Sequence, residues 1–512
     1  MLFSRVFSNN GLHGSKMFPV IYKRVTRDSL RKYSALKYKG QRNILRNFTI
    51  LAGVVLSTAI YVRYSSKRHI SFDTLPNFDE SHRKDTVTLL SDEQINTKLR
   101  TNQQSYLIDR GTGIYRYDIS QLPSNNPIED NHSEHIIQLR SDDAIKKNNE
   151  SSTYNNDLYF FGIYDGHGGP YTSTKLSQSL IAYVVRNIIK NDLINNSNKD
   201  VMDKTIQDAF LQLDNDIVIQ AFRNLLSDPT NKTFIKNVFP AISGSCALLS
   251  IYDSRTKKLK VAVTGDSRAL IIGKQSDGAH EQWFVKSCSI DQTGDNLNEV
   301  KRIREEHPNE PNVITRGRIL GSLQPSRAFG DYRYKLKEVD GQALDSLPDY
   351  LKLYLRSQPR NFLTPPYVTA RPEITTTKIN ENIKLMVIGS DGLFEFLTNE
   401  EIASLAIKWL ENDQGLIKDS KLPLVTDITE NIDDDSQRTA FRYRENRNKN
   451  NSNSLGYLLE DSNIATHLIR NALSAGGRKE FVSTLLSIPS PKSRKYRDDL
   501  TVTVVFFGEE NH

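Results

Sequence analysis

The amino-acid sequence predicts a mixed α+β fold, because short segments rich in β-branched and aromatic residues alternate with amphipathic helices. Branched and aromatic side chains favour strands, since they pack well on a pleated surface. The predicted strands are residues 159–164, 246–252, 259–263, 269–272, 385–388 and 500–507. Apolar residues at helical spacing predict helices at 173–190 and 203–222. At 512 residues, the chain fits one large folded unit with extensions.

The first predicted strand ends in the segment YFFGIYDGHGG, residues 159–169, where Asp165 and His167 stand among three glycines. A carboxylate at the mouth of a buried strand, with an imidazole two residues later, suits metal-assisted hydrolysis. The same residues also fit a strand that simply ends in a turn, because Asp-Gly is a common hairpin signal. The choice between the two depends on whether other acidic residues reach the same place.

Several other acids could meet Asp165. Asp391 and Asp498 each adjoin an apolar strand, and Asp266 lies in a turn between two more. Acids at strand edges can converge at the mouth of one sheet even when they are far apart in sequence. The pair Glu129-Asp130, in the polar segment NNPIEDNHSEH, has no evident structural duty. Taken singly, each of these acids also fits an ordinary turn or a solvated surface position.

The order of seven short segments is specific: PIED, DGHGG, SGSCALLS, GDSRA, SRAFGD, SDGLFEFL and RDDLTV. In this order they resemble the metal-dependent type-2C protein serine/threonine phosphatases, over roughly residues 106–508. Within that superfamily the chain is most similar to the mitochondrial pyruvate dehydrogenase phosphatases, as GRILGSLQPSRAFGD, TARPEIT and NIATHLIRNAL also indicate. The resemblance implies a central β-sandwich of two antiparallel sheets flanked by helices.

The resemblance also implies two Mg²⁺ or Mn²⁺ ions, which suit a site of scattered oxygen ligands without a Cys or His cluster. Asp165 would bridge both ions, and Gly166 would offer its main-chain oxygen. The remaining ligands are divided between the ions: Asp391 and Asp498 on one, Glu129 with Asp130 nearby on the other.

Two further residues take roles from the family pattern. Asp266 corresponds to the position that, with Asp391, binds a weaker third metal, although a plain turn acid explains Asp266 equally well. His167 would donate a proton to the leaving seryl oxygen while water polarised by the cations attacks phosphorus in line. An imidazole beside a carboxylate can also do no more than orient a loop.

One departure concerns the arginine that clamps the substrate phosphate in many type-2C phosphatases, four residues before the glutamate of PIED. Here that position is Asn125, as in the dehydrogenase phosphatase branch. Arg116, Arg268 and Arg327 are possible substitutes, and each also fits a structural ion pair. Asp499 stands where many relatives have asparagine after the metal-binding aspartate.

These motifs predict a Mg²⁺/Mn²⁺-dependent phosphatase that acts on phosphoserine of the pyruvate dehydrogenase alpha subunit in mitochondria and so reactivates that enzyme. One alternative is a mitochondrial phosphatase for another phosphoprotein. Another is a membrane-tethered pseudophosphatase that binds phosphoproteins as an adaptor. The intact acids Glu129, Asp165, Asp391 and Asp498 argue against the adaptor.

The basic character of the chain lies in its N-terminal leader. Residues 1–47 contain eleven Lys/Arg and one acid, a net charge of +10, whereas the whole chain carries +7, so the rest carries −3. The body therefore has no excess of cations for nucleic acid, and no nucleic-acid partner is expected. An acid-poor, Arg-rich and Ser-containing leader is typical of a mitochondrial presequence, although a generic basic tail also fits.

Residues 48–62, FTILAGVVLSTAIYV, are uncharged and lie between basic flanks. A helix of this length spans about 22 Å, short of the ~30 Å hydrocarbon core unless the bilayer thins or flanking residues snorkel. The segment predicts a membrane anchor or sorting signal at the inner mitochondrial membrane, facing the matrix or the intermembrane space. A buried helix is the alternative.

The remaining organisation follows from composition. Residues 63–105 are polar and predict a linker, and 106–509 predict the catalytic domain. Within it, residues 413–454 contain IDDDSQ and RENRNKNNSNS and predict a disordered insertion. With only Cys246 and Cys288, neither a disulfide framework nor a zinc site is supported. His467 lies on a helical pattern and predicts a structural role.

Overall fold

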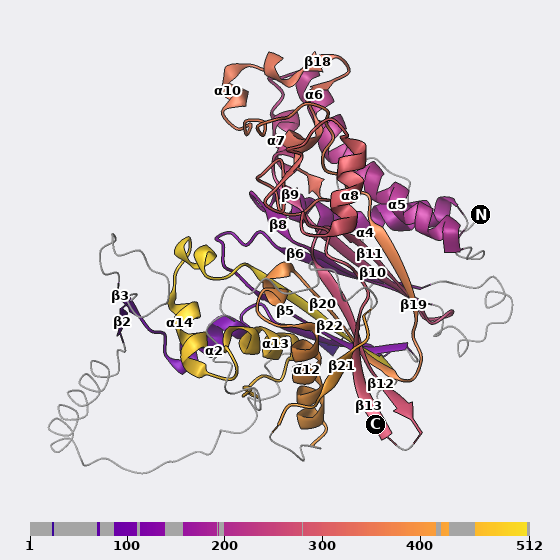
Figure 1. The fold of residues 1–512 in the computed structure, drawn as a ribbon, viewed down its shortest axis with the longest axis vertical. Coiled ribbons are helices and arrows are strands. Elements are labelled where there is room, and N and C mark those ends of the chain that lie inside the picture. Colours follow the sequence, from indigo (N-terminus) through magenta and orange to yellow (C-terminus); the bar gives the residue numbers. More distant parts are fainter. Residues whose placement is uncertain are drawn as a thin grey trace, which may run out of the picture.

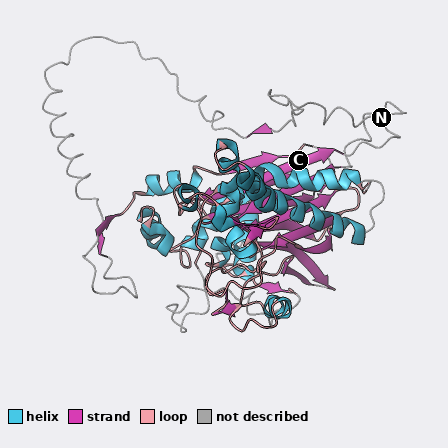
Figure 2. Ribbon diagram, turned by 90° about the horizontal axis from the view of Figure 1, so that it is seen from above, coloured by secondary structure: helices cyan, strands magenta, loops and turns pink. Residues whose placement is uncertain are grey.

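The computed structural model shows two β-sheets stacked face to face, with helices on both outer sides (Figure 1). Figure 2 shows the same layers from above, with helices in cyan and strands in magenta. The structure describes residues 86–109, 113–138, 157–191, 193, 199–278, 280–415, 421–429 and 456–508, and the short strands β1 Lys23–Arg24 and β2 His69–Ser71. The predicted α+β fold with a two-sheet sandwich is confirmed.

The larger sheet has eight strands in the order β1-β4-β5-β22-β20-β12-β13-β21. Neighbours pair antiparallel, except that β13 and β21 are parallel. After β1, its strands are β4 Gln104–Leu107, β5 Gly113–Leu122, β12 Arg268–Asp277, β13 His280–Ser287, β20 Ile383–Gly389, β21 Val425–Asp427 and β22 Leu500–Gly508.

The smaller sheet has five antiparallel strands in the order β19-β11-β10-β7-β6. Its strands are β6 Asn131–Gln138, β7 Asp157–Tyr164, β10 Ala247–Asp253, β11 Lys258–Thr264 and β19 Glu373–Lys378. Every residue of β7 is buried, which explains its unbroken apolar run. All six strands predicted from the sequence are confirmed in these two sheets, with ends that differ by a few residues.

Alternating residues of the central strands supply two different cores. In β22, Val505 belongs to the core between the two sheets, whereas Val504 belongs to the core between the larger sheet and its helices. In β20, Met386 and Val387 divide in the same way. Successive side chains of a strand point to opposite faces, so the central strands of the larger sheet are buried on both sides.

Helices on the outer face of the larger sheet are α2 Asp92–Arg100, α12 Asn399–Asp413, α13 Ile464–Leu473 and α14 Lys479–Ser487. The outer face of the smaller sheet is covered by α4 Tyr171–Lys190, α5 Lys199–Asn215, the π-helix η4 Asp216–Gln220, α6 Ala221–Ser227 and α7 Lys232–Ile242. The predicted helix 173–190 is confirmed as α4, and the prediction 203–222 falls in the run from α5 to α6.

Most other elements are short and lie between β13 and β19, in a part of the chain that projects beyond the sheets with α6 and α7. We call this projection the upper lobe; α10 and β18 lie at its tip (Figure 1). The short elements are β3 Thr86–Thr88, β8 Gly166–His167, β9 Gly244–Ser245, α8 Leu297–Glu306, β14 Ile314–Thr315, β15 Arg318–Ile319, β16 Phe329–Gly330, α9 Tyr332–Lys335, β17 Glu338–Val339, β18 Gln342–Ala343, η5 Leu344–Ser346, α10 Asp349–Lys352, α11 Asp391–Phe394 and η8 Lys492–Lys495.

The predicted linker 63–105 is wrong for its last part. Ser91 starts α2 with a capping box completed by Gln94, and Ile95 and Leu99 of α2 are buried in the core with α13 and α14. The segment is polar in sequence because α2 is short and has few apolar residues. Its two buried side chains nevertheless pack α2 against the folded body. The folded body therefore begins before residue 106.

The predicted insertion 413–454 is likewise ordered in part. Residues 421–429 are described and contain β21, Val425–Asp427, which extends the larger sheet, and Thr429 donates its hydroxyl to Asp427. Residues 416–420 and 430–455 lie outside the described residues. The presequence 1–47, apart from β1, and the proposed membrane segment 48–62 also lie outside them. Within the described part of the chain, no helix is long and apolar enough to cross a bilayer.

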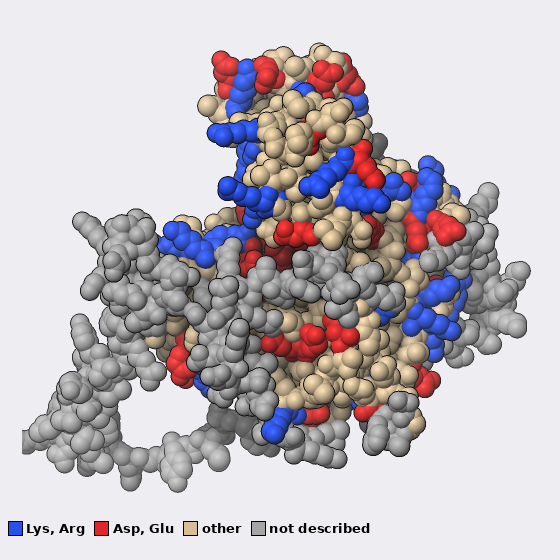
Figure 3. Space-filling model, viewed as in Figure 1, with Lys and Arg blue, Asp and Glu red and all other residues tan. Residues whose placement is uncertain are grey.

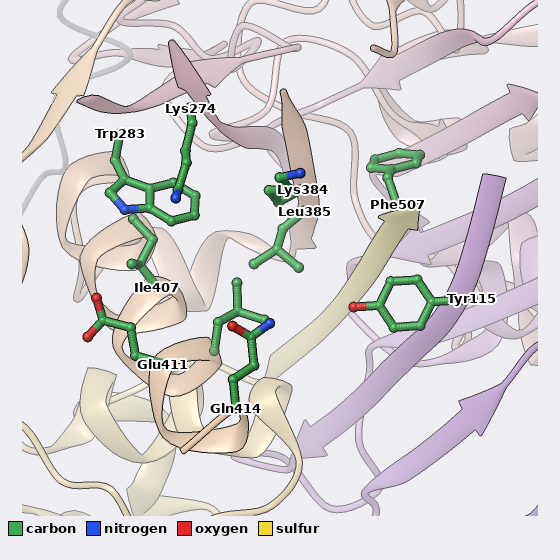
Figure 4. Close-up of a pocket in the computed structure, with 10 residues that line it drawn as sticks. Tyr115, Lys274, Trp283, Lys384, Leu385, Ile407, Glu411, Gln414 and Phe507 are labelled. Carbon is green, nitrogen blue, oxygen red and sulfur yellow. The ribbon is translucent and has the colours of Figure 1, made fainter. Parts of the chain in front are cut away.

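A cavity of about 340 Å³ lies between the larger sheet and α12 (Figure 4). Leu385 of β20 and Phe507 of β22 line it, together with Trp283 and Ile407. Both strands carry their functional acids at the opposite end, beyond Gly389 and before Leu500. The cavity is therefore separate from the acids considered next.

Candidate metal centre

Asp165 follows the last residue of β7, where this inner strand of the smaller sheet ends. Its main-chain oxygen accepts a hydrogen bond from the N–H of Cys246 at 2.8 Å. The chain then continues as β8, which pairs with β9, so Asp165-Gly166 is not the turn of a hairpin. A side chain at Gly166 would collide with the main-chain oxygen of Glu129, which explains why glycine follows the aspartate.

Three of the predicted ligands come together at this point. Oxygen atoms of Asp165, Asp266 and Asp391 lie within 4.8 Å of one another. The main-chain N–H of Asp391, at the start of α11, donates to Oδ2 of Asp165 at 3.3 Å. Oδ1 of Asp391 is buried and has no hydrogen-bond partner among the described residues. The turn acid Asp266 thus belongs to the cluster.

Glu129 and Asp130 come directly before β6, which pairs with β7, and this pairing places them beside Asp165. Asp130 is only 2% exposed, and Oδ2 accepts the hydroxyl of Thr501 at 2.7 Å. Oε1 of Glu129 accepts the N–H of Gly169 at 2.6 Å. The PIED and DGHGG segments are therefore joined directly, and the pair Glu129-Asp130 is not a solvated surface position.

Asp499 holds the PIED loop in place. Its carboxylate accepts main-chain N–H groups from Ser124 at 2.5 Å, Asn125 at 2.9 Å and Glu129 at 2.8 Å. The side-chain amide of Asn125 donates to Asp499 at 3.2 Å and to Glu129 at 3.3 Å. The departures at positions 125 and 499 are thus coupled, because each residue bonds the other and both position Glu129.

Replacing Asp499 by Asn is expected to weaken divalent-metal binding about 10- to 100-fold, since it removes an oxygen that accepts N–H groups next to Glu129. Calorimetric titration of the EDTA-treated protein with Mn²⁺ measures this change. Asp208, a half-exposed acid on α5, supplies the matched control Asp208→Asn. Equal Mn²⁺ affinity in the two variants would contradict the positioning role of Asp499.

Asp498 lies beside the SDG turn, since its Cβ is 3.3 Å from where a Cβ on Gly392 would be. Its carboxylate forms an ion pair with Arg494, one helical turn earlier on η8. The main-chain N–H of Asp499 also donates to Asp498 Oδ1 at 2.7 Å. Asp498 therefore lies at the edge of the cluster, and its carboxylate is already paired with Arg494.

His167 contacts a residue that the sequence analysis did not single out. Its Nε2 is 2.6 Å from Oδ2 of Asp331, the last residue of SRAFGD. Burial lowers the pKa of His167, but the charge and hydrogen bond of Asp331 outweigh burial and raise it. A side chain at Gly244 would collide with both groups. Asp331 has left-handed backbone angles, φ 51° and ψ 43°, which is uncommon for a residue other than glycine.

The three arginines suggested for the substrate phosphate do not reach the cluster as free cations. Arg116 pairs with Asp118, Arg268 pairs with Asp291, and Arg327 pairs with Glu299 and Glu373. Arg268 and Arg327 are also buried. All three form structural ion pairs, so the ion-pair interpretation of the sequence is confirmed, and none of them substitutes for the phosphate-clamping arginine. The arginines next to the cluster are Arg494 and Arg356, which donates to the main-chain oxygen of Gly168 at 2.9 Å.

The acids of the cluster are short of positive charge. Burial raises the pKa of Asp130 to about 8 and that of Asp266 to about 7, and nearby carboxylates add to both effects. Burial and the charges of Asp391, Asp130 and Asp266 raise the pKa of Asp165, and burial raises that of Glu129. Hard divalent cations would relieve this repulsion, and an all-oxygen donor set with an unpartnered buried oxygen fits them.

Cys246 and His467 do not add to the donor set. The thiol of Cys246 donates to Asp266 Oδ1 at 3.1 Å, and burial raises the pKa of that thiol well above its usual range. His467 is buried in α13, where Nε2 is 3.1 Å from the main-chain oxygen of Leu405, and burial lowers its pKa to about 4. His467 is structural, as predicted, and the thiol of Cys246 is occupied by its hydrogen bond to Asp266.

The metal-free protein is expected to lose stability as the pH rises from about 4 to 8. A carboxyl with a raised folded-state pKa stabilises the fold fully below its unfolded pKa, which is about 3.9 for aspartate. That stabilisation is lost as the pH passes the folded values of about 8 for Asp130 and about 7 for Asp266. Melting curves in EDTA at about pH 6 and 8.5 measure the loss, and Asp130→Asn should reduce it. A melting temperature that rises over this range would contradict the expectation.

Residues 134–439 match the family model for protein phosphatase 2C. The chain is 54% identical over 499 residues to the Saccharomyces cerevisiae protein "[Pyruvate dehydrogenase [acetyl-transferring]]-phosphatase 1, mitochondrial", covering 90% of this chain and 85% of that one. It is 34% identical to a protein phosphatase 2C homolog of Schizosaccharomyces pombe, covering 92% and 97%. It is 28% identical to the pyruvate dehydrogenase phosphatase 1 of Bos taurus, covering 82% and 83%.

Proposed function

Since the chain belongs to the protein phosphatase 2C family, we propose that it removes phosphate from phosphoserine of the pyruvate dehydrogenase alpha subunit, with divalent metal ions as cofactors. The observation that carries the reaction class is the convergence of Asp165, Asp266 and Asp391 beside Glu129 and Asp130. The substrate rests on the names of the relatives that the chain resembles along most of its length.

Four acids would hold two Mg²⁺ or Mn²⁺ ions: Glu129, Asp165, Asp391 and Asp498. Gly166 would add its main-chain oxygen, Asp130 would act nearby, and Asp266 with Asp391 would hold a weaker third ion. Bound cations of this kind supply the charge that makes water more acidic and offsets the negative charge of a phosphate monoester. Asp499 and Asn125 keep Glu129 directed at the site.

His167 would protonate the leaving seryl oxygen. Asp331 accepts from Nε2 and favours the imidazolium, so a proton remains on Nδ1 for transfer. Gly244 has no side chain, so the carboxylate of Asp331 and the imidazole of His167 can approach each other. Their hydrogen bond also fixes the plane of the imidazole ring. Asp331 acts through His167 and is a positioning residue.

The substrate proposal is tested with the purified full-length protein and phosphorylated pyruvate dehydrogenase complex. Mass spectrometry should show loss of alpha-subunit phosphoserine in the presence of Mn²⁺ and no loss in EDTA. The matching cellular measurement compares mitochondrial phosphoproteins with and without the gene. Accumulation of other phosphosites without the alpha-subunit site would point to another mitochondrial substrate and overturn this assignment.

We also propose a mitochondrial location, supported by the acid-poor leader and by the names of the relatives. Residues 48–62 would attach the protein to the inner membrane, on the matrix or the intermembrane-space side. Carbonate extraction of isolated mitochondria tests whether the protein is anchored in the membrane at all: an anchored protein stays in the membrane pellet. Release of the protein into the supernatant would exclude the anchor but leave the phosphatase assignment intact.

A further inference from the structure

An exposed apolar surface lies on the upper lobe next to the DGHGG loop. The ring of Tyr171, the residue after GGP, is 5.1 Å from the ring of Phe239, which is 6.1 Å from that of Tyr354. Tyr171 is 50% exposed, Tyr354 is 59% exposed, and the adjoining Leu353 is 85% exposed. We call these four residues the aromatic ridge. Isolated exposed apolar residues are ordinary, but a contiguous row beside a catalytic centre indicates a binding surface.

The ridge is held firmly by its neighbours. Leu351 is buried, and Leu355 packs against the same core, so the side chains before and after Leu353 and Tyr354 anchor the segment. The main-chain oxygen of Arg356 accepts the hydroxyl of Tyr332 at 2.8 Å. Leu353 and Tyr354 therefore face solvent from an ordered segment, at low entropic cost for a partner that covers them.

A cation stands between the ridge and the acids. The guanidinium of Arg356 donates to the main-chain oxygen of Gly168 at 2.9 Å, and a side chain at Gly168 would collide with it. Gly168 lies between His167, the proposed proton donor, and Gly169, whose N–H binds Glu129. No carboxylate pairs with Arg356 in the part of the chain that the structure describes. Figure 3 shows Lys and Arg side chains on the rim of the upper lobe above acidic side chains deep in the hollow beneath it.

We propose that the aromatic ridge and Arg356 form the docking surface for the substrate polypeptide. Arg356 takes the phosphate of the phosphoserine, in place of the arginine that is absent at position 125. The ridge takes an apolar side chain close to the phosphoserine in the same peptide. This inference rests on the proposed phosphatase function, and it adds a preference for apolar sequence around the phosphorylated residue.

The occupant follows from charge and position. The guanidinium of Arg356 has no carboxylate partner among the described residues and contacts Gly168, the neighbour of the proposed proton donor His167. It complements a phosphate dianion with bidentate geometry. A chain that places its phosphate there must continue over the lobe, where Leu353 and Tyr354 offer uncovered apolar area. Arg356 and the aromatic ridge together fit one ligand, a peptide that carries phosphoserine and an apolar residue close to it.

The test uses the full-length protein with Mn²⁺ and two sets of phosphoserine peptides, which carry either Leu or Ser at positions near the phosphoserine. The wild type should show a KM about tenfold lower for the best Leu peptide than for its Ser counterpart. The double variant Leu353→Ser, Tyr354→Ala should lose most of this discrimination. Leu297→Ser, at a 72% exposed leucine on α8, is the matched control and should keep it.

Arg356→Gln should raise the KM of Leu and Ser peptides alike, by about tenfold or more, because a charged hydrogen bond to phosphate is lost. A rise confined to peptides with an acidic flanking residue would overturn the phosphate role of Arg356. Equal KM values for Leu and Ser peptides in the wild type, or discrimination retained in the double variant, would overturn the ridge.

Two further readouts keep the interpretation specific. The substrate p-nitrophenyl phosphate contains no peptide, so its hydrolysis by the wild-type protein reports on the proposed function alone. Its absence with Mn²⁺ would reject the phosphatase assignment, whereas its presence without peptide discrimination would reject only the docking surface. Light scattering measures self-association: a change of oligomeric state in the double variant with unchanged KM values would assign the ridge to a second copy of the chain.

Discussion

Replacing Asp165 by Asn is expected to lower phosphate release from a phosphoserine peptide by at least about 1,000-fold, equivalent to about 4 kcal/mol of lost transition-state stabilisation. Asp165 is the acid that the others surround: Asp391 donates its N–H to it, and Asp266 lies within the same group of oxygens. Asparagine keeps the size of the side chain and removes its charge. Initial rates at saturating Mn²⁺ measure the effect.

The loss should come from the chemistry and not from unfolding. In metal-free protein, Asp165→Asn removes a carboxylate that nearby carboxylates destabilise, so its melting temperature in EDTA should equal or exceed that of the wild type. Asp208→Asn, on the outer helix α5, should keep wild-type activity. More than about a tenth of wild-type activity in Asp165→Asn would contradict a central role for Asp165.

Replacing His167 by Ala is expected to reduce the hydrolysis of phosphoserine peptides about 100-fold or more, while affecting p-nitrophenyl phosphate far less. A seryl alkoxide needs a proton as it leaves, whereas p-nitrophenolate is a stable anion. The ratio of kcat values for the two substrates therefore isolates proton donation. An equal loss on both substrates would contradict the role of His167 as the acid.

Asp331→Asn should follow the same pattern with a smaller loss, about 10- to 100-fold on the phosphoserine peptide. The amide leaves the ring of His167 without its charge partner, so the imidazolium is less favoured and the pKa of His167 falls. The kcat for the peptide should then decline at a lower pH than in the wild type. A pH profile that does not shift would show that Asp331 serves the loop and not His167.

Much of the fold could be predicted because the central strands are buried on both faces. Segments such as β7 and β22 then appear as continuous apolar runs, and their ends are marked by acids. The predicted positions of Asp165, Asp391 and Asp498 depend only on this local pattern. That Asp165 and Asp391 meet, with Asp498 at the edge of their cluster, depends on sheet order, which the resemblance supplied and the local pattern did not.

The interpretation failed where a role depends on residues brought together by the fold. Asp331 was visible in SRAFGD, yet only the pairing of β9 with β8 and β16 places it against His167. The ion-pair interpretation of the three arginines is confirmed, but their partners, such as Asp291 for Arg268, come from the fold and not from the sequence pattern. The segment of helix α2 has the composition of a linker because only Ile95 and Leu99 of its residues are buried.

The residues at positions 125 and 499 show the same limit in a more informative way. Each departs from the commoner family pattern, and the sequence alone does not connect the two. In the structure they bond one another and together orient Glu129. The coupling between Asn125 and Asp499 becomes apparent only in the structure, where the PIED loop lies beside the start of β22.

The most direct test of a metal-dependent phosphatase centre is phosphate release from a phosphoserine peptide by the EDTA-treated full-length protein as Mn²⁺ is added. We expect no release without metal, release that rises and saturates with Mn²⁺, and no recovery in Asp165→Asn at any Mn²⁺ concentration. Release that persists in EDTA, or that fails to appear with either Mn²⁺ or Mg²⁺, would contradict the assignment of the acid cluster as the catalytic metal centre.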